Sequence, residues 1–354
     1  MLFAYTYVPH QMEKMQEFID FIFFEVWCKA PDGEPFSLDL FDGHAELKEV
    51  MEAFHYSDTK GADFFNSHVE SIYGLFATLT SDQIDKFRQW YQANNEIEKV
   101  CANDQTVHVV TYSDIETTHL SLGEQLKSFF EKLYSFNPKA LREKIGQIDD
   151  HYHDFVAVNN KGKCPFCGIG DIKGIHHSKR EAYDHYLPKS RYPFNSINFR
   201  NLAPACHECN STYKLSKDPV QTAAGRRKAF YPYASTSQQL EISIDFSNPD
   251  VDNLTASDVQ LTFGPSIISE ELDAWKDVYG IEERYKAKCC SGDAKDWLEQ
   301  VRILRDEHGV EPTDALASWR KQSEKDLTAN SNFLRVAFLE GCHRLGLWSS
   351  HSPA

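Results

Sequence analysis

Residues 184–210 read DHYLPKSRYPFNSINFRNLAPACHECN, and they follow a Cys-Pro-Phe-Cys stretch at 164–167. The longer stretch contains a second Cys-x2-Cys pair at 206–209, so that 38 residues separate the two pairs. Two such pairs can supply four thiolates to a tetrahedral zinc ion. This spacing predicts a structural zinc, with a further unit built between the pairs. The expected ligands are Cys164, Cys167, Cys206 and Cys209.

Two other interpretations of the cysteines stay open at this point. His207 lies inside the second pair and could replace a thiolate, although four cysteines already complete the shell. The four thiols could also be unrelated buried residues, since free cysteine is commonly buried.

Asp184 and His185 are adjacent in the stretch between the cysteine pairs. Phosphodiester hydrolysis needs a deprotonated water and relief of charge on the phosphoryl oxygens, and a bound metal can provide the second. A histidine with a pKa near ~6.5 can take the proton of the water at neutral pH. Successive strand residues point to opposite faces, so both side chains can serve one phosphate only where a strand ends or distorts. Pro188 is consistent with such an end.

The order of these residues resembles the HNH nuclease family, whose pattern runs Asp-His, then Asn-Leu, then Cys-x2-Cys followed at once by His or Asn. The resemblance covers roughly 55–70 of the 354 residues. It implies a ββα-metal unit, in which two short strands and a helix surround one catalytic divalent ion. The structural zinc clips the hairpin to the helix. The family's products are a 5′-phosphate and a 3′-hydroxyl.

The resemblance also implies a role for each matching residue. It makes Asp184 a ligand of the catalytic metal, His185 the general base, Asn201 the residue that braces the loop and orients the histidine, and Asn210 the second metal ligand. Asn210 stands where many members have histidine, and an amide oxygen suits Mg2+ better than a nitrogen does. Mg2+ or Mn2+ is therefore the expected catalytic ion.

Two of these assignments carry alternatives. Asn195 and Asn198 compete with Asn201 for the bracing role, and the Leu-x-Pro-x-Cys that follows Asn201 favours Asn201. Lys214 lies one residue further along than the lysine usual in the family. A helix that begins near residue 204 would place Asn210 and Lys214 on one face, four residues apart.

The charge of the chain is distributed unevenly. The net charge is −16, but residues 161–230 hold thirteen Lys or Arg against five Asp or Glu, so this island carries +8 and the remainder −24. Phosphate attracts basic surfaces, so basic side chains of the island are candidates for nucleic-acid contact. The selected candidates are Lys189, Arg191, Arg200, Lys214, Arg226 and Arg227.

The composition, with 41% apolar residues, is that of an ordered globular protein. We expect an α+β, mainly α-helical fold with a ββα-metal HNH core and structural zinc between helical flanking regions. The expected parts are a mostly helical region at 1–150, the nuclease domain with zinc at 151–235, and a strand pair with helices at 236–354. Strand-like patterns occur at four places: residues 2–8, 106–112, 240–246 and 258–263.

The apolar run 18–27 carries two acidic residues, which fits neither a signal peptide nor a membrane span. A cytoplasmic location without membrane contact is therefore expected. No GxxxxGK[ST] loop occurs, so any nucleotide hydrolysis would come from a partner.

The leading hypothesis is a metal-dependent HNH endonuclease that cleaves DNA. Its arrangement is similar to that of bacterial anti-phage effector nucleases, such as Septu-type HNH subunits that work beside an ATPase. That resemblance implies an antiviral defence role and an ATPase partner. Two alternatives stay open: a non-catalytic zinc-dependent nucleic-acid-binding module, and an HNH nuclease that acts on RNA.

Overall fold

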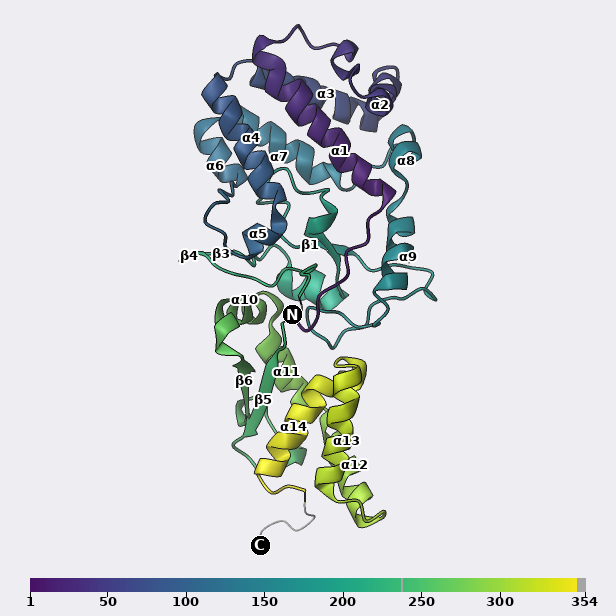
Figure 1. Cartoon of the computed structure of the whole chain (residues 1–354), viewed down its shortest axis with the longest axis vertical. Helices are drawn as coiled ribbons and strands as arrows, with labels where there is room; N and C mark the ends of the chain where they lie inside the picture. Colours follow the sequence, from purple (N-terminus) through teal and green to yellow (C-terminus); the bar gives the residue numbers. More distant parts are fainter. Residues whose placement is uncertain (237, 349–354) are drawn as a thin grey trace.

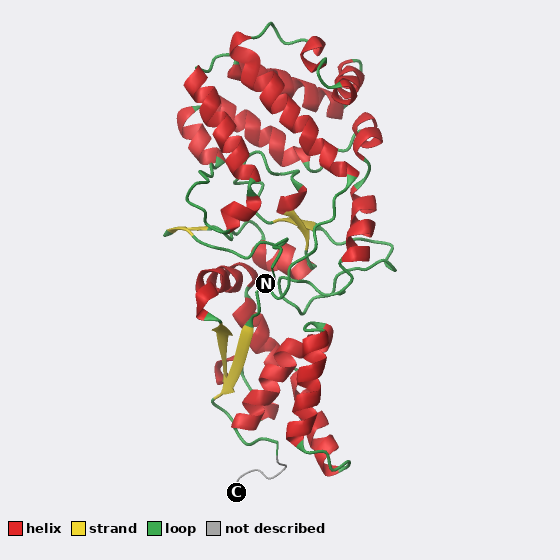
Figure 2. Cartoon of the chain, in the orientation of Figure 1, coloured by secondary structure: helices red, strands yellow, loops and turns green. Residues whose placement is uncertain are grey.

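The computed structural model describes residues 1–236 and 238–348. The chain is mainly helical and elongated, with the N-terminal helices at one end, the C-terminal helices at the other and a small β-hairpin between them (Figures 1 and 2). The first residues lie near the hairpin, at the middle of the molecule. No helix in the described ranges has the length and apolar character needed to cross a membrane.

Amphipathic helices build the N-terminal end, as the spacing of apolar residues in the sequence predicts. The apolar side of α3 buries Phe65, Val69 and Ile72, and that of α7 buries Leu126 and other residues in the same core. The helices are α1 (Lys14–Phe21), α2 (Ala45–His55), α3 (Lys60–Phe76), α4 (Ser81–Asn95), α5 (Ile97–Cys101), α6 (Tyr112–Thr118), α7 (Leu120–Leu133), α8 (Lys139–Ile145) and α9 (Ile148–Val158).

The expectation of strands at 2–8 and 106–112 is wrong. Both segments lack regular helix or strand structure over most of their length, and their backbone groups bond to other partners instead of to a neighbouring strand. The amide of Tyr5 donates to the carbonyl of Pro232 (2.8 Å), and the amide of Val110 donates to a side-chain carbonyl on α4 (2.9 Å). The strand-like pattern therefore reflects burial in the core here, and not membership of a sheet: Leu2, Phe3 and Tyr5 are all buried.

The middle of the chain forms a hairpin and a short helix. Strand β1 (Tyr183–His185) pairs antiparallel with β2 (Leu202–Pro204), and Asp184 lies opposite Ala203. The helix η6 (Glu208–Lys214) follows, so two short strands and a helix occur in the order expected for this stretch. A second small pair, β3 (Gln221–Thr222) with β4 (Gly225–Arg226), comes next.

The C-terminal end contains the strand pair expected from the sequence. Strand β5 (Glu241–Phe246) pairs antiparallel with β6 (Val259–Gly264) in a register that places Ile244 opposite Leu261. Helix α14 packs on this pair, where the rings of Phe338 and Phe246 lie 5.2 Å apart. The helices are α10 (Ser269–Tyr279), α11 (Ile281–Cys289), α12 (Gly292–Asp306), α13 (Pro312–Lys325) and α14 (Asn332–Arg344).

Two apolar cores meet at the loop between β1 and β2. One core lies among the N-terminal helices, and the other is shared by the hairpin, the cysteines and the C-terminal helices. Phe194 of the loop is fully buried in the N-terminal core, with its ring 5.5 Å from Phe23, 5.1 Å from Tyr91 and 5.4 Å from Phe130. Its φ of +78° is unusual for a bulky residue and is held by this packing.

Phe194→Ala is expected to lower the free energy of unfolding by about 3–5 kcal/mol, because it opens a cavity in a filled aromatic core. Urea denaturation of the full chain measures this change. Tyr56, whose side chain is 81% exposed, provides the control, and Tyr56→Ala should stay within about 0.5 kcal/mol of the parent. Equal stability of the two variants would contradict the anchoring of the loop by Phe194.

Candidate active site and metal centre

The structure brings the two cysteine pairs together. The sulfur atoms of Cys164, Cys167, Cys206 and Cys209 all lie within 4.8 Å of one another, and all four residues are buried. The four cysteines are therefore positioned to bind a metal, and a donor set of four sulfurs suits zinc. His207 is exposed and lies outside this group of ligands.

Glycines let the chain turn around the first cysteine pair. The amide of Gly168 donates to the carbonyl of Cys164 (2.7 Å), and Gly168 has a φ of +68°, which favours glycine. The amide of Gly170 donates to the sulfur of Cys167 (3.3 Å). A Cβ atom on Gly170 would lie 2.6 Å from the sulfur of Cys206, so only glycine allows the second pair to approach.

Arg284 of α11 reaches the cysteine cluster from the C-terminal end of the chain. Its guanidinium donates to the sulfur of Cys209 (3.2 Å) and to the carbonyl of Tyr279 (3.3 Å), and it stacks on the ring of Tyr213 at 4.8 Å. Four thiolates around one divalent ion leave a net negative charge, which a guanidinium offsets. Hydrogen bonds from neighbouring thiols, together with Arg284, hold the pKa of Cys167 well below its ordinary value.

Asp184 is buried in the hairpin, and one of its two carboxylate oxygens has no partner among the described residues. Oδ1 accepts a hydrogen bond from the ammonium of Lys214 (2.9 Å), whereas Oδ2 is buried without a hydrogen bond. Burial raises the pKa of Asp184, and the ion pair with Lys214 opposes this shift. A buried carboxylate oxygen without a partner is costly unless it binds another group.

His185 presents one ring nitrogen to a partner that can only accept. Its Nε2 lies 2.9 Å from the carbonyl oxygen of Ser196, so Nε2 carries the proton and Nδ1 has the lone pair. The ring of Tyr134 contacts the imidazole edge-to-face at 4.6 Å. Burial, and then the charge of Lys189, lower the pKa of His185 to about 3, so the imidazole is neutral at neutral pH.

Asn201 is fully buried, and its side chain forms hydrogen bonds with the segment that follows β1. Its side-chain oxygen accepts from the amide of Leu187 (2.7 Å), and its side-chain nitrogen donates to the carbonyl of the same residue (3.0 Å). The nitrogen also lies 3.3 Å from the side-chain oxygen of Asn195. Ser196, whose carbonyl holds His185, follows Asn195 directly. The expected bracing residue thus contacts both ends of the loop that carries this carbonyl.

Asn195 and Asn198 connect the same loop to the N-terminal helices. The side chain of Asn195 donates to the carbonyl of Asn94 (3.0 Å), and that of Asn198 donates to the side chain of Asn95 (2.9 Å). Both partners lie at the end of α4. The two residues that compete with Asn201 in the sequence therefore bond α4, and Asn195 also accepts from Asn201.

Asn210 and Lys214 lie about one turn apart on η6. Asn210 is half-buried, and within the described ranges its side chain forms no hydrogen bond. Lys214 is fully buried, and its ammonium donates to Asp184 and to the carbonyl of His185 (2.8 Å). This position differs from the surface phosphate contact expected for Lys214.

Two further basic candidates are also engaged within the protein. Arg226 donates to the carbonyl of Val107 (2.7 Å), and Arg227 donates to the carbonyl of Pro219 (3.0 Å) and to Asp277 (2.7 Å). Both side chains are half-buried. Their guanidinium groups therefore stabilise the chain around β3 and β4.

The three other basic candidates are nearer the surface. Lys189 donates to a backbone carbonyl near the end of α7 (2.8 Å), Arg191 lies 3.2 Å from Asp218, and Arg200 stacks over the ring of Tyr7 at 4.3 Å. Arg191 and Arg200 are exposed.

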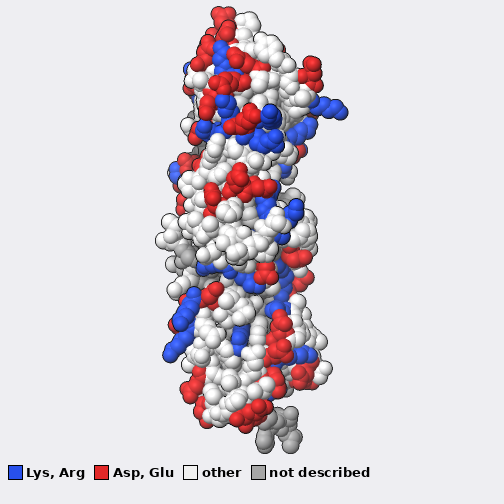
Figure 3. All heavy atoms as spheres, turned by 90° about the vertical axis from the view of Figure 1, so that its right-hand side faces the viewer, with Lys and Arg blue, Asp and Glu red and all other residues white. Residues whose placement is uncertain are grey.

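Acidic side chains gather at both ends of the face in Figure 3, while basic and acidic side chains alternate between them.

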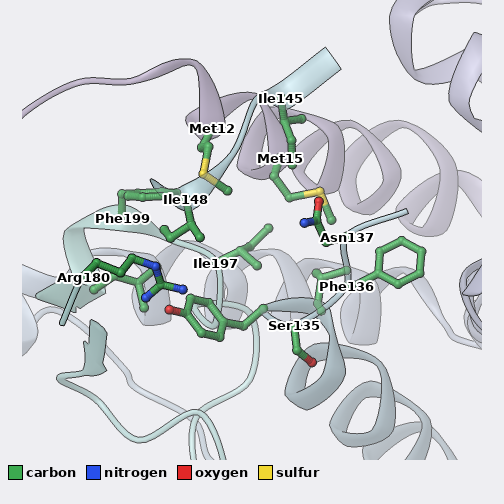
Figure 4. Close-up of a pocket in the computed structure, with 13 residues that line it drawn as sticks. Met12, Met15, Ser135, Phe136, Asn137, Ile145, Ile148, Arg180, Ile197 and Phe199 are labelled. Atoms are coloured by element: carbon green, nitrogen blue, oxygen red, sulfur yellow. The ribbon is translucent and has the colours of Figure 1, made fainter. Parts of the chain in front are cut away.

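A cavity of about 290 Å³ lies beside the loop that orients His185 (Figure 4). Tyr134, which contacts the imidazole, and Ile197, which follows Ser196, both line it. Its other lining residues are mostly apolar: Met12, Met15, Leu133, Ser135, Phe136, Asn137, Ile145, Ile148, Arg180, Phe199 and Leu202. The loop therefore has an apolar gap on one side.

Sequence reasoning missed several residues of this site. Ser196 contributes only a backbone carbonyl, which leaves no pattern in sequence, and Arg284 lies 75 residues from Cys209. The roles of Gly168 and Gly170 could have been predicted from the sequence, because glycines directly after a Cys-x2-Cys pair are typical of a tight metal-binding turn.

Two known proteins are similar to part of this chain. Protein ea31 of Escherichia phage lambda is 37% identical over 120 residues, which are 34% of this chain and 36% of ea31. The Septu protein PtuB of Bacillus thuringiensis is 34% identical over 64 residues, which are 17% of this chain and 24% of PtuB. The chain thus spans about a third of one relative and a quarter of the other. No family model and no solved structure matches the chain.

Arg284→Met is expected to weaken zinc affinity about 10–100-fold, because a group that bonds a metal ligand stabilises the charge of the bound form. Competition with a chromogenic chelator measures the affinity. Arg284→Lys should recover part of it. Arg320→Met removes an exposed arginine that pairs with Glu340 on another helix, and it should leave zinc binding unchanged. Unaltered affinity in Arg284→Met would show that the hydrogen bond to Cys209 does not support the metal centre.

Proposed function

We propose that this protein is a metal-dependent HNH endonuclease, in which β1, β2 and η6 form a ββα-metal unit. The observation that carries the proposal is the side-by-side placement of Asp184 and His185. Among the described residues Asp184 has a buried carboxylate oxygen without a partner, and His185 bonds through Nε2, which leaves the Nδ1 lone pair available. A metal ligand and a general base need these two properties.

The donor set around the carboxylate fits Mg2+ or Mn2+. Asp184 and Asn210 would hold the ion with oxygen atoms, which both ions prefer. When bound, such an ion supplies charge stabilisation to the phosphoryl group and the leaving oxygen. The cysteine cluster has a structural role instead, because it fixes Asn210, which directly follows the ligand Cys209.

His185 would accept the proton of the attacking water at Nδ1. The carbonyl of Ser196 holds the ring by its Nε2 hydrogen, which keeps the tautomer that leaves Nδ1 free. Asn201 acts as a positioning residue, because it bonds Leu187 on one side of the loop and Asn195 on the other. Loss of Asn201 would therefore act through the orientation of His185.

DNA is the proposed substrate, and exposed basic residues such as Arg191 and Arg200 would contact its phosphates. The likeness to a Septu protein supports a role in anti-phage defence. An ATPase is the proposed partner. Two alternatives predict other outcomes in the same assay. An RNA nuclease would cleave RNA through the same residues, and a zinc-dependent binding module would cleave nothing.

The test is cleavage of plasmid, single-stranded DNA and RNA with Mg2+, with Mn2+ or with EDTA. His185→Ala is expected to lower the rate of DNA cleavage about 10²–10⁴-fold, because it removes the general base. Its zinc content and its affinity for DNA should stay near those of the parent. His176→Ala is the matched control, since His176 is exposed and lies on a loop outside the site.

Asn201→Leu separates a positioning role from a catalytic one. It should lower the cleavage rate and alter its pH profile, because the imidazole loses its fixed orientation while both metal ligands remain. Cleavage by His185→Ala at the rate of the parent would contradict the proposed role of His185 as general base. A parent protein that binds DNA but cleaves no substrate with any metal would favour the binding module.

A further inference from the structure

Lys214 occupies an unusual place for a lysine, because its ammonium is buried. Its side chain is 1% exposed, and that of Asp184 is 3% exposed. The ammonium lies 2.9 Å from Oδ1 of Asp184 and 2.8 Å from the carbonyl oxygen of His185. Two of its three N–H groups are therefore directed at the two residues of the proposed active site. A lysine is rarely buried in this way unless it is paired.

The position of Lys214 conflicts with a divalent ion on the same carboxylate. Lys214 binds one proposed ligand, Asp184, and follows the other, Asn210, by about one helical turn on η6. A divalent cation held by Asp184 would lie within a few ångströms of the ammonium, and two cations so close in a buried site repel each other strongly.

We infer that Lys214 is a built-in counter-ion that competes with the catalytic metal for Asp184. In the absence of substrate the ammonium neutralises the buried carboxylate and weakens metal binding. When a phosphodiester enters, the ammonium of Lys214 pairs with its negative oxygens. The ion pair with Asp184 then breaks, and the carboxylate becomes free to bind the metal. Metal and nucleic acid then bind cooperatively, each favouring the other. This inference rests on the proposed function and adds the regulation of the same site.

The local structure allows such an exchange. Lysine carries its charge on a flexible four-carbon stem, so the ammonium can move without a shift of the backbone. Lys214 is the last residue of η6, and Leu215 after it leaves the helix with a φ of +50°. Oδ2 of Asp184 already lacks a partner, so the carboxylate has an oxygen ready for a second cation.

The exchange also reconciles two features of Lys214. It belongs to the basic island of the sequence, yet it is buried where phosphate cannot reach it in the free protein. A lysine that pairs with Asp184 before substrate binds, and with phosphate afterwards, has a use in both states. By linkage, the factor by which DNA tightens metal binding must equal the factor by which metal tightens DNA binding.

The test measures Mn2+ binding to zinc-loaded protein by the loss of the free Mn2+ signal in electron paramagnetic resonance. His185→Ala is the background, so that duplex DNA stays uncut. Lys214→Met, which keeps the apolar stem and removes the charge, is expected to bind Mn2+ at least 10-fold more tightly than this background. Duplex DNA should tighten Mn2+ binding at least 10-fold in the background protein and less than 3-fold in Lys214→Met.

Lys217→Met is the matched control. Lys217 is exposed, three residues further along, and donates to the carbonyl of Asp277 (3.0 Å), so its loss changes the net charge equally without touching the site. Lys214→Gln is the second variant, in case methionine beside a buried carboxylate impairs folding. Zinc content and thermal unfolding identify folded protein, and Mn2+ should raise the Tm of Lys214→Met more than that of the background.

The outcomes separate this inference from the proposed function. If Mn2+ binds the background protein and Asp184→Asn abolishes the binding, but folded Lys214→Met or Lys214→Gln binds Mn2+ no more tightly, the counter-ion role is wrong and the metal site stands. If no variant binds Mn2+ with or without DNA, both the inference and the proposed metal site are overturned.

Discussion

Four thiols within 4.8 Å of one another place the turn of the first cysteine pair beside the start of η6. The first pair lies in a glycine-bounded turn, and the second pair leads into η6, so a metal bound there fixes the helix against the hairpin. Asn210 follows Cys209 by one residue and Lys214 ends the same helix, which means that their distance to Asp184 depends on this centre. Arg284 extends the dependence to the C-terminal helices, since it bonds the sulfur of Cys209.

The imidazole of His185 depends on a second support, which comes from the other end of the molecule. Its hydrogen-bond partner, the carbonyl of Ser196, lies in a loop whose Phe194 is buried among N-terminal helices. Asn201 closes the loop at the hairpin, and Asn195 bonds the end of α4. The proposed metal ligands and the proposed general base thus depend on contacts with different parts of the chain.

The sequence predicted the local chemistry better than the long-range contacts. Equal Cys-x2-Cys spacing identified the four cysteines, because ligand spacing is fixed by the geometry of one ion. Period-two alternation identified β5 and β6 but misled at residues 2–8, where residues such as Leu2 and Phe3 are buried without pairing in a sheet. The burial of Lys214 could not be predicted from charge alone. Its ammonium is buried because it pairs with the carboxylate of Asp184, which lies 30 residues away in the chain. Asp184 and His185 are adjacent in β1, and their roles as metal ligand and base stay predictions.

Anomalous diffraction from crystals of zinc-loaded protein, grown with Mn2+ and an uncleavable duplex, tests the central claim most directly. The account predicts two separate metal peaks, zinc at the four cysteines and manganese between Asp184 and Asn210. It also predicts that the ammonium of Lys214 has left Asp184 for a phosphate oxygen, with Nδ1 of His185 facing the scissile phosphate. A single peak at the cysteines, with duplex bound and Lys214 still paired with Asp184, would contradict it.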